Sequence, residues 1–187
     1  MADYQPILKT TFNRERCRHM AGWQTLVLHC HHFASLTTQL ANDCSLLDAK
    51  KLLEQCAEDA FYPVLTDYYR DNNVLCHEER IRIAERYFAE AGLGKLIVTY
   101  AGTCGGEVVL EHSHVDEGWV KKWGQATQPV NHIGRGYVTA LFCAVYDRPR
   151  RSFTAKERQS IACGADVSVI TVTDVIGLEK GGNCIGY

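Results

Sequence analysis

Apolar residues recur with helical spacing in two stretches of the first half of the chain. One stretch begins at Leu52, after Asp48, whose side chain suits the N-cap of a helix. Pro63 predicts that this helix kinks or restarts, because proline lacks the backbone N–H that a helix uses. A second helix is predicted over residues 81–91, where the apolar residues share one face and Gly92 provides a stop.

Two pairs of short β-rich runs follow these helices. Residues 96–100 and 107–111 alternate between apolar and polar positions, and the glycine-containing segment 101–106 separates them. This pattern predicts a β-hairpin. Residues 153–162 and 165–172 predict a second pair of strands, which the glycine between them interrupts.

The region between the two strand pairs is helical in pattern again. Residues 115–124 carry Trp119 and Trp123 one turn apart, so both rings are expected on the same surface. Residues 134–146 are almost entirely apolar and predict a central, buried helix. Small residues lie on one stripe of this helix, where another element can approach closely.

The order of these elements predicts an α+β fold, with an antiparallel β-sheet packed against helices. Strands that follow one another through short turns pair in antiparallel fashion, and no β-α-β alternation is present. We expect a single domain over residues 1–187, because there is no internal repeat and no linker-like segment before the end. Residues 1–20 show no regular period and are expected to be irregular, and residues 177–187 are expected to form a loose tail.

Composition narrows the classes of partner and compartment. The 20 Lys and Arg residues nearly balance the 22 Asp and Glu residues, which argues against nucleic acids and anionic membranes as partners. No apolar stretch approaches the roughly 20 residues of a membrane span, and no signal peptide is recognisable, so we expect a cytoplasmic protein. The nine cysteines form no Cys-x-x-Cys pair and predict no disulfide framework. Cys104 and Cys184 are expected to be the most accessible thiols, with no role assigned.

A cluster of histidines supplies the first candidate chemistry. On a helix His29 and His32 share a face, whereas on a strand His29 and His31 do. Either pair provides two imidazole ligands for zinc or iron, and a histidine-bound metal ion is the cofactor that the sequence suggests. The alternative is that these histidines bind backbone groups or face water, since the sequence locates no third ligand.

A second group of candidates surrounds the central helix. A pocket between residues 134–146 and the sheet would be mostly apolar, with a few polar groups that orient a ligand. The alternative is structural, with Ser113 or Asp116 capping the helix over residues 115–124. The predicted ligand-binding residues are Trp119, Trp123, His114, His132 and Tyr137.

Four short segments carry a family resemblance over residues 78–175. They are Ala91-Gly92-Leu93-Gly94 before a strand, Gly105-Gly106 opening the next strand, Pro129-Val130-Asn131-His132 before the central helix, and the segment from Glu157 to Ser168. In these features the chain resembles the 4-vinyl reductase-type, or hydrocarbon-binding, domain family. That family is related to TRAPP Golgi-tethering subunits and to haem-binding nitric-oxide sensors. The resemblance implies a TRAPP-like ligand-binding fold.

The resemblance also raises the question of a metal site. Several members of the family hold zinc through cysteines and a glutamate, at positions that correspond here to Asn131, Glu157, Ser160, Gly164 and Ser168. One amide and two hydroxyls therefore stand where thiolates would be, and these groups are poor zinc ligands. We expect the zinc site of the family to be absent.

These observations favour a sensor or carrier domain for a small apolar or aromatic molecule, assembled as a homodimer. The alternative is a metal-dependent enzyme or tetrapyrrole-processing factor that uses the clustered histidines. A third possibility is a purely structural dimer subunit. A retained organic molecule would favour the first, a stoichiometric metal the second and an empty dimer the third.

Overall fold

The computed structural model describes residues 7, 9–21, 24–27 and 29–175. The predicted tail over residues 177–187, with Cys184, lies outside the described residues. No helix in the described ranges has the length and apolar character needed to cross a membrane. The elements in chain order are β1 Thr10–Asn13, β2 Arg18–Ala21, β3 Gln24–Leu26, α1 His31–Asp43, α2 Ala49–Asp71, α3 His77–Glu90, β4 Gly94–Gly102, β5 Gly105–Ser113, α4 His114–Trp123, α5 His132–Val145, β6 Phe153–Gln159, the short 3-10 helix η1 Ile161–Cys163, and β7 Ser168–Asp174.

The main sheet is antiparallel, and its strands lie in the order β4-β5-β7-β6. Both predicted strand pairs are present, β4 with β5 and β6 with β7. The two pairs are joined because β5 also pairs with β7, with Val108 opposite Ile170. The predicted strand over residues 153–162 ends early at Gln159, where η1 turns the chain and Gly164 adopts a left-handed conformation with φ 93°. The α+β fold with an antiparallel sheet is confirmed.

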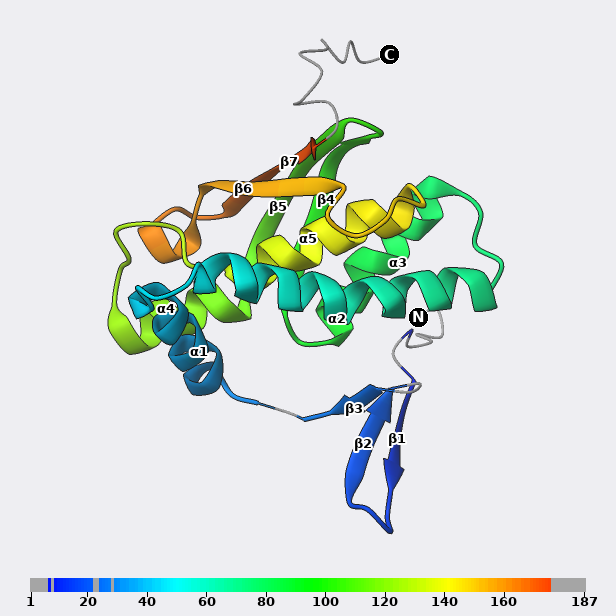
Figure 1. Ribbon diagram of the computed structural model, residues 1–187, viewed down its shortest axis with the longest axis horizontal. Helices are drawn as coiled ribbons and strands as arrows, with labels where there is room; N and C mark the ends of the chain where they lie inside the picture. Colours follow the sequence, from blue (N-terminus) through cyan, green and yellow to red (C-terminus); the bar gives the residue numbers. More distant parts are fainter. Residues whose placement is uncertain (1–6, 8, 22–23, 28, 176–187) are drawn as a thin grey trace.

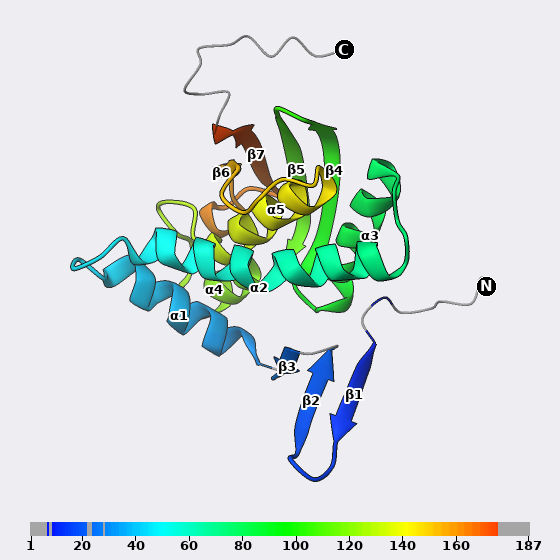
Figure 2. The same cartoon turned by 45° about the vertical axis from the view of Figure 1, so that its right-hand side comes forward.

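Helix α5 forms the centre of the molecule, between the sheet and α2 (Figures 1 and 2). Every residue from Gly136 to Val145 is buried, as the apolar pattern predicts. A side chain at Gly136 would overlap the carbonyl oxygen of Glu54, so the missing Cβ lets α2 approach closely. On the sheet, Val108 and Leu110 alternate with partly exposed residues and bury one face. The core therefore lies along α5.

The N-terminal residues correct one prediction. Residues 1–20 were expected to be irregular, but β1, β2 and β3 form a small antiparallel sheet that projects from the body of the molecule (Figure 1). All four residues of β1 are exposed, so these strands pair through their backbones without a buried face. Alternating hydrophobicity, the pattern that identifies strands, is absent for that reason. The Gln24 side-chain amide donates to the carbonyl oxygen of Ala60 at 2.9 Å and connects this sheet to α2.

Helix α1 was not predicted, and its burial pattern explains why. The residues that it buries are small or polar: Ala34, Ser35, Thr38 and Ala41. Its large apolar residues Phe33, Leu36 and Leu40 are exposed. An amphipathic helix usually buries its large apolar side chains. In α1 the apolar face is the exposed one, so the hydrophobic pattern does not identify the buried face.

Of the two outcomes predicted at Pro63, a kink or a restart of the helix, the restart is wrong. Helix α2 is a single helix of 23 residues with Pro63 inside it. Proline removes one backbone hydrogen bond, but α2 packs along much of α5, and this packing outweighs the local loss. The predicted N-cap is present, because the carboxylate of Asp48 accepts a hydrogen bond from the backbone N–H of Lys51 at 3.0 Å.

Candidate functional site

A cavity of about 330 Å³ lies between α2, α3, the residues that precede β1 and the end of β2. Leu65 from α2 and Tyr87 from α3 form a nearly buried apolar wall, and Ile7 and Ala21 close the cavity from the N-terminal side. Its volume is at the lower end of the range of small-molecule sites. The lining residues are Ile7, Lys9, Ala21, Val64, Leu65, Asp67, Tyr68, Asp71, Asn72, Ile83 and Tyr87.

The walls of this cavity combine an aromatic surface with a polar edge. The ring of Tyr87 lies nearly parallel to that of Tyr137, with 6.5 Å between the ring centroids. Burial raises the pKa of Tyr87, so its hydroxyl stays neutral at physiological pH. Asp67 and Asp71 at the edge form ion pairs with Arg70 at 2.9 and 3.1 Å. An apolar molecule with one polar group would meet suitable surfaces here.

The three aromatic residues predicted to line a pocket lie at different depths. Tyr137 is fully buried, and its hydroxyl donates to the carbonyl oxygen of Ala84 at 2.6 Å. Trp119 belongs to a separate small cluster with Val130, whereas Trp123 is half-exposed. The two tryptophan ring centroids are 6.5 Å apart, as their spacing on one helix implies. Their part in ligand binding stays a prediction.

The two histidines of the predicted pocket have separate surroundings. His132 Nε2 lies 2.9 Å from Asn42 Oδ1, and Arg135 Nη2 lies 2.6 Å from His132 Nδ1. Arginine only donates, so the imidazole is neutral and carries its proton on Nε2. Burial, together with Arg135, lowers the pKa of His132 to about 4. His114 begins α4, and its ring centroid is 5.5 Å from that of His29.

The predicted metal-binding histidines form contacts with other histidines. His32 lies on α1 with its ring centroid 4.1 Å from that of His31, whereas His29 precedes the helix. Among the residues that the structure describes, no group of three or more His, Cys, Asp or Glu side chains is arranged to hold a metal ion. A metal site at His29 and His32 stays a prediction. Cys104 is exposed at the turn between β4 and β5.

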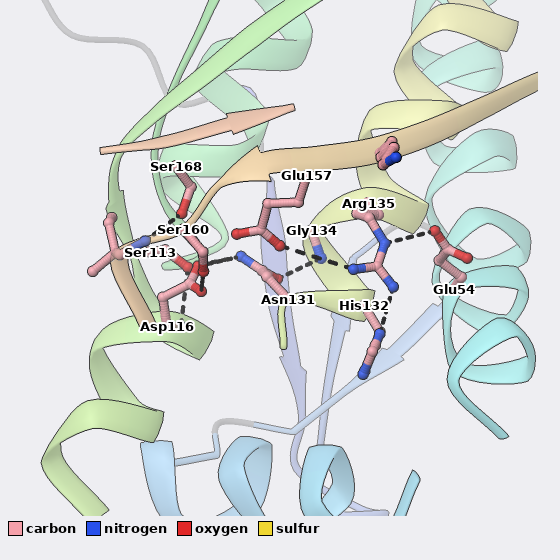
Figure 3. A network of polar contacts seen from close by, with 12 residues as sticks. Glu54, Ser113, Asp116, Asn131, His132, Gly134, Arg135, Glu157, Ser160 and Ser168 are labelled. Atoms are coloured by element: carbon pink, nitrogen blue, oxygen red, sulfur yellow. Dashed lines mark hydrogen bonds and ion pairs between the residues drawn. The ribbon is translucent and has the colours of Figure 1, made fainter. Parts of the chain in front are cut away.

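A buried polar centre connects α4, α5, β6 and β7 (Figure 3). Asp116 is fully buried, and its two carboxylate oxygens accept hydrogen bonds from the Asn131 amide at 2.6 Å and the Ser160 hydroxyl at 3.2 Å. The Asn131 amide also donates to the Ser113 hydroxyl oxygen at 2.9 Å. Its own oxygen accepts from the backbone N–H of Gly134 at 2.8 Å and so caps α5. The polar centre consists of Ser113, Asp116, Asn131, Glu157, Ser160 and Ser168.

Glu157 is the unusual member of the polar centre. Its side chain is fully buried, and neither carboxyl oxygen has a hydrogen-bond partner. Arg135 Nη1 lies 3.9 Å from Glu157 Oε2, and the same guanidinium binds Glu54 at 2.9 Å. Burial, reinforced by Asp116, raises the pKa of Glu157 to about 7. Burial raises the pKa of Asp116 too, but its hydrogen bonds from Asn131 and Ser160 counteract that rise, so Glu157 is the carboxyl of the pair that takes up a proton more readily.

The polar centre occupies the positions where the family resemblance implies zinc ligands. Asn131, Glu157, Ser160 and Ser168 converge there from four different segments (Figure 3). Their donors are one amide, one carboxylate and two hydroxyls. Structural zinc sites use thiolates and imidazoles, so this set does not fit zinc.

The fold is similar to those of solved structures, although the sequence itself gives no match. No family model and no curated protein matches the sequence. The structure is similar to the phenol-responsive sensory domain of the transcription activator PoxR, solved with phenol, with a TM-score of 0.76 and 16% identity. That match covers 92% of this chain and 88% of the other chain.

Two further structures extend the comparison. A TRAPP complex subunit 3 from Naegleria fowleri, covalently bound to palmitic acid, has a TM-score of 0.51 and 15% identity, covering 77% of this chain and 93% of that one. A vinyl-4-reductase family protein from Methanocaldococcus jannaschii has a TM-score of 0.49 and 13% identity, covering 77% and 78%. The predicted 4-vinyl reductase/TRAPP-like fold is confirmed.

The residues that line the cavity were not predicted from the sequence. Tyr87 and Ile83 lie on a helix that the sequence does predict, but nothing in their spacing distinguishes a cavity wall from ordinary core. Ile7 and Ala21 come from segments that showed no pattern at all. A cavity between three distant segments leaves no local signal.

Proposed function

We propose that this chain is a sensor domain that binds a small aromatic or apolar molecule in the cavity between α2 and α3. The observation that carries the proposal is the match with a phenol-responsive sensory domain over nearly the whole of both chains. The cavity supports it, because about 330 Å³ accommodates a molecule of one-ring size with room for a substituent. The ring would contact Tyr87, and a hydroxyl would point towards the polar edge.

Phenol is the probe for the first experiment. Isothermal titration calorimetry would give the affinity, and thermal unfolding with and without phenol would show the linked stabilisation. At a phenol concentration 100 times the Kd, bound ligand adds about 2.7 kcal/mol to the free energy of unfolding. Val64→Trp fills the cavity and should abolish both signals.

A matched variant separates loss of the cavity from a general effect of added tryptophan. Val120→Trp places the same side chain on α4, at a partly exposed position that does not line the cavity. It should bind phenol like the wild type. If Val64→Trp folds and retains full phenol affinity, the ligand does not bind in this cavity. If the wild type binds neither phenol nor toluene, the proposed ligand class is wrong.

The residues predicted from the sequence offer a second location for the ligand. Trp119 and Trp123 lie on one surface of α4, as a ligand-stacking pair would. Replacing both by alanine should weaken phenol binding if this surface forms the pocket. Unchanged phenol affinity in the folded double variant would show that the ligand does not bind at this surface. Loss of phenol binding in Val64→Trp would then identify the α2–α3 cavity as the site.

We also propose that the sensor domain forms a homodimer through α1. Phe33, Leu36 and Leu40 share one face of α1 and are 57%, 47% and 61% exposed. Leu46 and Leu47, in the segment that follows α1, are exposed as well. Contiguous exposed apolar side chains of this size mark interaction surfaces, and a two-fold pair is the commonest arrangement.

A further inference from the structure

The hydrogen bonds of the polar centre join several segments of the chain, as a structural metal ion would. Its hydrogen bonds join segments that are distant in sequence: Asp116 on α4, Asn131 before α5 and Ser160 before η1. The Ser168 hydroxyl oxygen at the start of β7 accepts from the backbone N–H of Ile161 at 2.9 Å. One buried carboxylate thus connects the same kinds of segment that a four-coordinate ion would.

The Asn131 and Asp116 oxygens that a metal ion would need are already engaged, and among the carboxyl oxygens of the polar centre only those of Glu157 have no hydrogen-bond donor. The Asn131 oxygen holds the first turn of α5, and the Asn131 N–H groups point at Asp116 and Ser113. Both Asp116 oxygens have donors. A cation at the centre of these residues would have to break several buried hydrogen bonds, each costly to leave unpaired.

The positive charge of the region comes from a side chain. Arg135 on α5 lies between Glu54 on α2 and Glu157 on β6, at 2.9 and 3.9 Å. The guanidinium is always protonated and holds carboxylates in fixed directions. It therefore compensates the nearly buried Glu54 carboxylate and faces Glu157 without an external ion.

We propose that this chain has a metal-independent polar centre, in which Asp116 and its hydrogen-bond donors replace the zinc ion of cysteine-bearing relatives and Arg135 supplies the cationic charge. The centre holds α4, α5 and η1 together through hydrogen bonds alone. Chelators consequently do not change its stability, which depends on Asp116 and not on a bound metal ion.

The decisive measurement is elemental analysis of the wild-type chain purified from zinc-supplemented medium without a chelator. We expect much less than one equivalent of any metal per chain, and a thermal unfolding midpoint that EDTA does not change. About one equivalent of zinc, or of a hard divalent cation, lost on Glu157→Gln would overturn the proposal. A midpoint lowered by EDTA would overturn it as well.

A variant designed to gain metal binding tests whether the side chains at positions 131, 160 and 168 converge next to Glu157. The triple variant Asn131→Cys, Ser160→Cys and Ser168→Cys restores three thiolates next to Glu157, and should bind about one zinc per chain. A control with cysteines at the exposed positions Asn72, Thr103 and Arg158 should not. If the folded triple variant binds no more zinc than the control, these side chains do not converge as proposed. If it fails to fold, the wild-type measurement still decides.

The role of Asp116 has its own test. Asp116→Ala leaves the donors of Asn131 and Ser160 without a buried acceptor, and should lower the unfolding midpoint by about 10 °C. Added zinc should not restore it. A midpoint within about 2 °C of the wild type would show that Asp116 does not hold the centre together.

Discussion

Glu157 and His132 contact the same guanidinium and respond to pH in opposite directions. Arg135 lies 3.9 Å from the Glu157 carboxylate and 2.6 Å from His132 Nδ1. Burial disfavours the charged form of each side chain, so it raises the pKa of the acid and lowers that of the base. Their effects on stability therefore oppose each other over nearly the same pH range, and single substitutions are needed to separate them.

The Glu157 contribution should be seen as a loss of stability on raising the pH. Its pKa is about 7 in the folded chain against a usual 4.5, so the folded state keeps the proton longer. Stability from this group is complete below about pH 4.5 and is lost as the pH rises through 7. Glu157→Gln stays neutral, so its free energy of unfolding should lack this decline. Urea unfolding from pH 4 to 8 would check it, and an unchanged decline would contradict the assignment.

The His132 contribution has the opposite sign. Its pKa is about 4 in the folded chain against 6.5 when unfolded, so the unfolded state takes up the proton first. Stability from this group is complete above pH 6.5 and is lost as the pH falls through 4, by about 3 kcal/mol in total. His132→Gln keeps a donor and an acceptor without titrating. The difference between wild-type and variant unfolding free energies should shrink on acidification, and a constant difference would refute the prediction.

At the scale of elements, the pairing of α2 with α5 organises the core. The stripe of small residues on α5 predicts that another element approaches closely, and the structure shows that this element is α2. The contact between the two helices also explains why α2 continues through Pro63. The helix-breaking tendency of Pro63 was outweighed by the packing of α2 against α5, and no local pattern in the sequence reveals that packing.

Gly136 is the residue on which this contact depends. A methyl group there would overlap the backbone of Glu54 and lie 2.7 Å from Ala57 Cβ. Gly136→Ala should lower the free energy of unfolding by roughly 3 kcal/mol, since the helices must move apart. Gly102→Ala is the control, because its nearest neighbour is the flexible end of Tyr100. Chemical denaturation of both variants would measure the difference, and equal effects would contradict the close approach.

At the scale of the whole molecule, the proposed homodimer can be tested through the exposed face of α1. Light scattering should give a molar mass of about twice the 21.0 kDa chain for the wild type. Leu36→Asp with Leu40→Asp should give a monomer, because charges would be buried in the proposed interface. Val27→Asp is the control, since Val27 is exposed but lies outside α1. A monomeric wild type, or a dimer that survives the double substitution, would rule out this interface.

The sequence alone determined the elements whose burial follows a regular period. The apolar run of α5, the face of α3 and the two strand pairs were predictable because neighbouring residues share one environment. The resemblance placed Asn131, Glu157, Ser160 and Ser168 in one group before any geometry was known. Only the tertiary structure decided the pairing of β5 with β7, the cavity and the acceptor role of Asp116. These features depend on contacts between distant segments, and local periodicity carries no information about which segments meet.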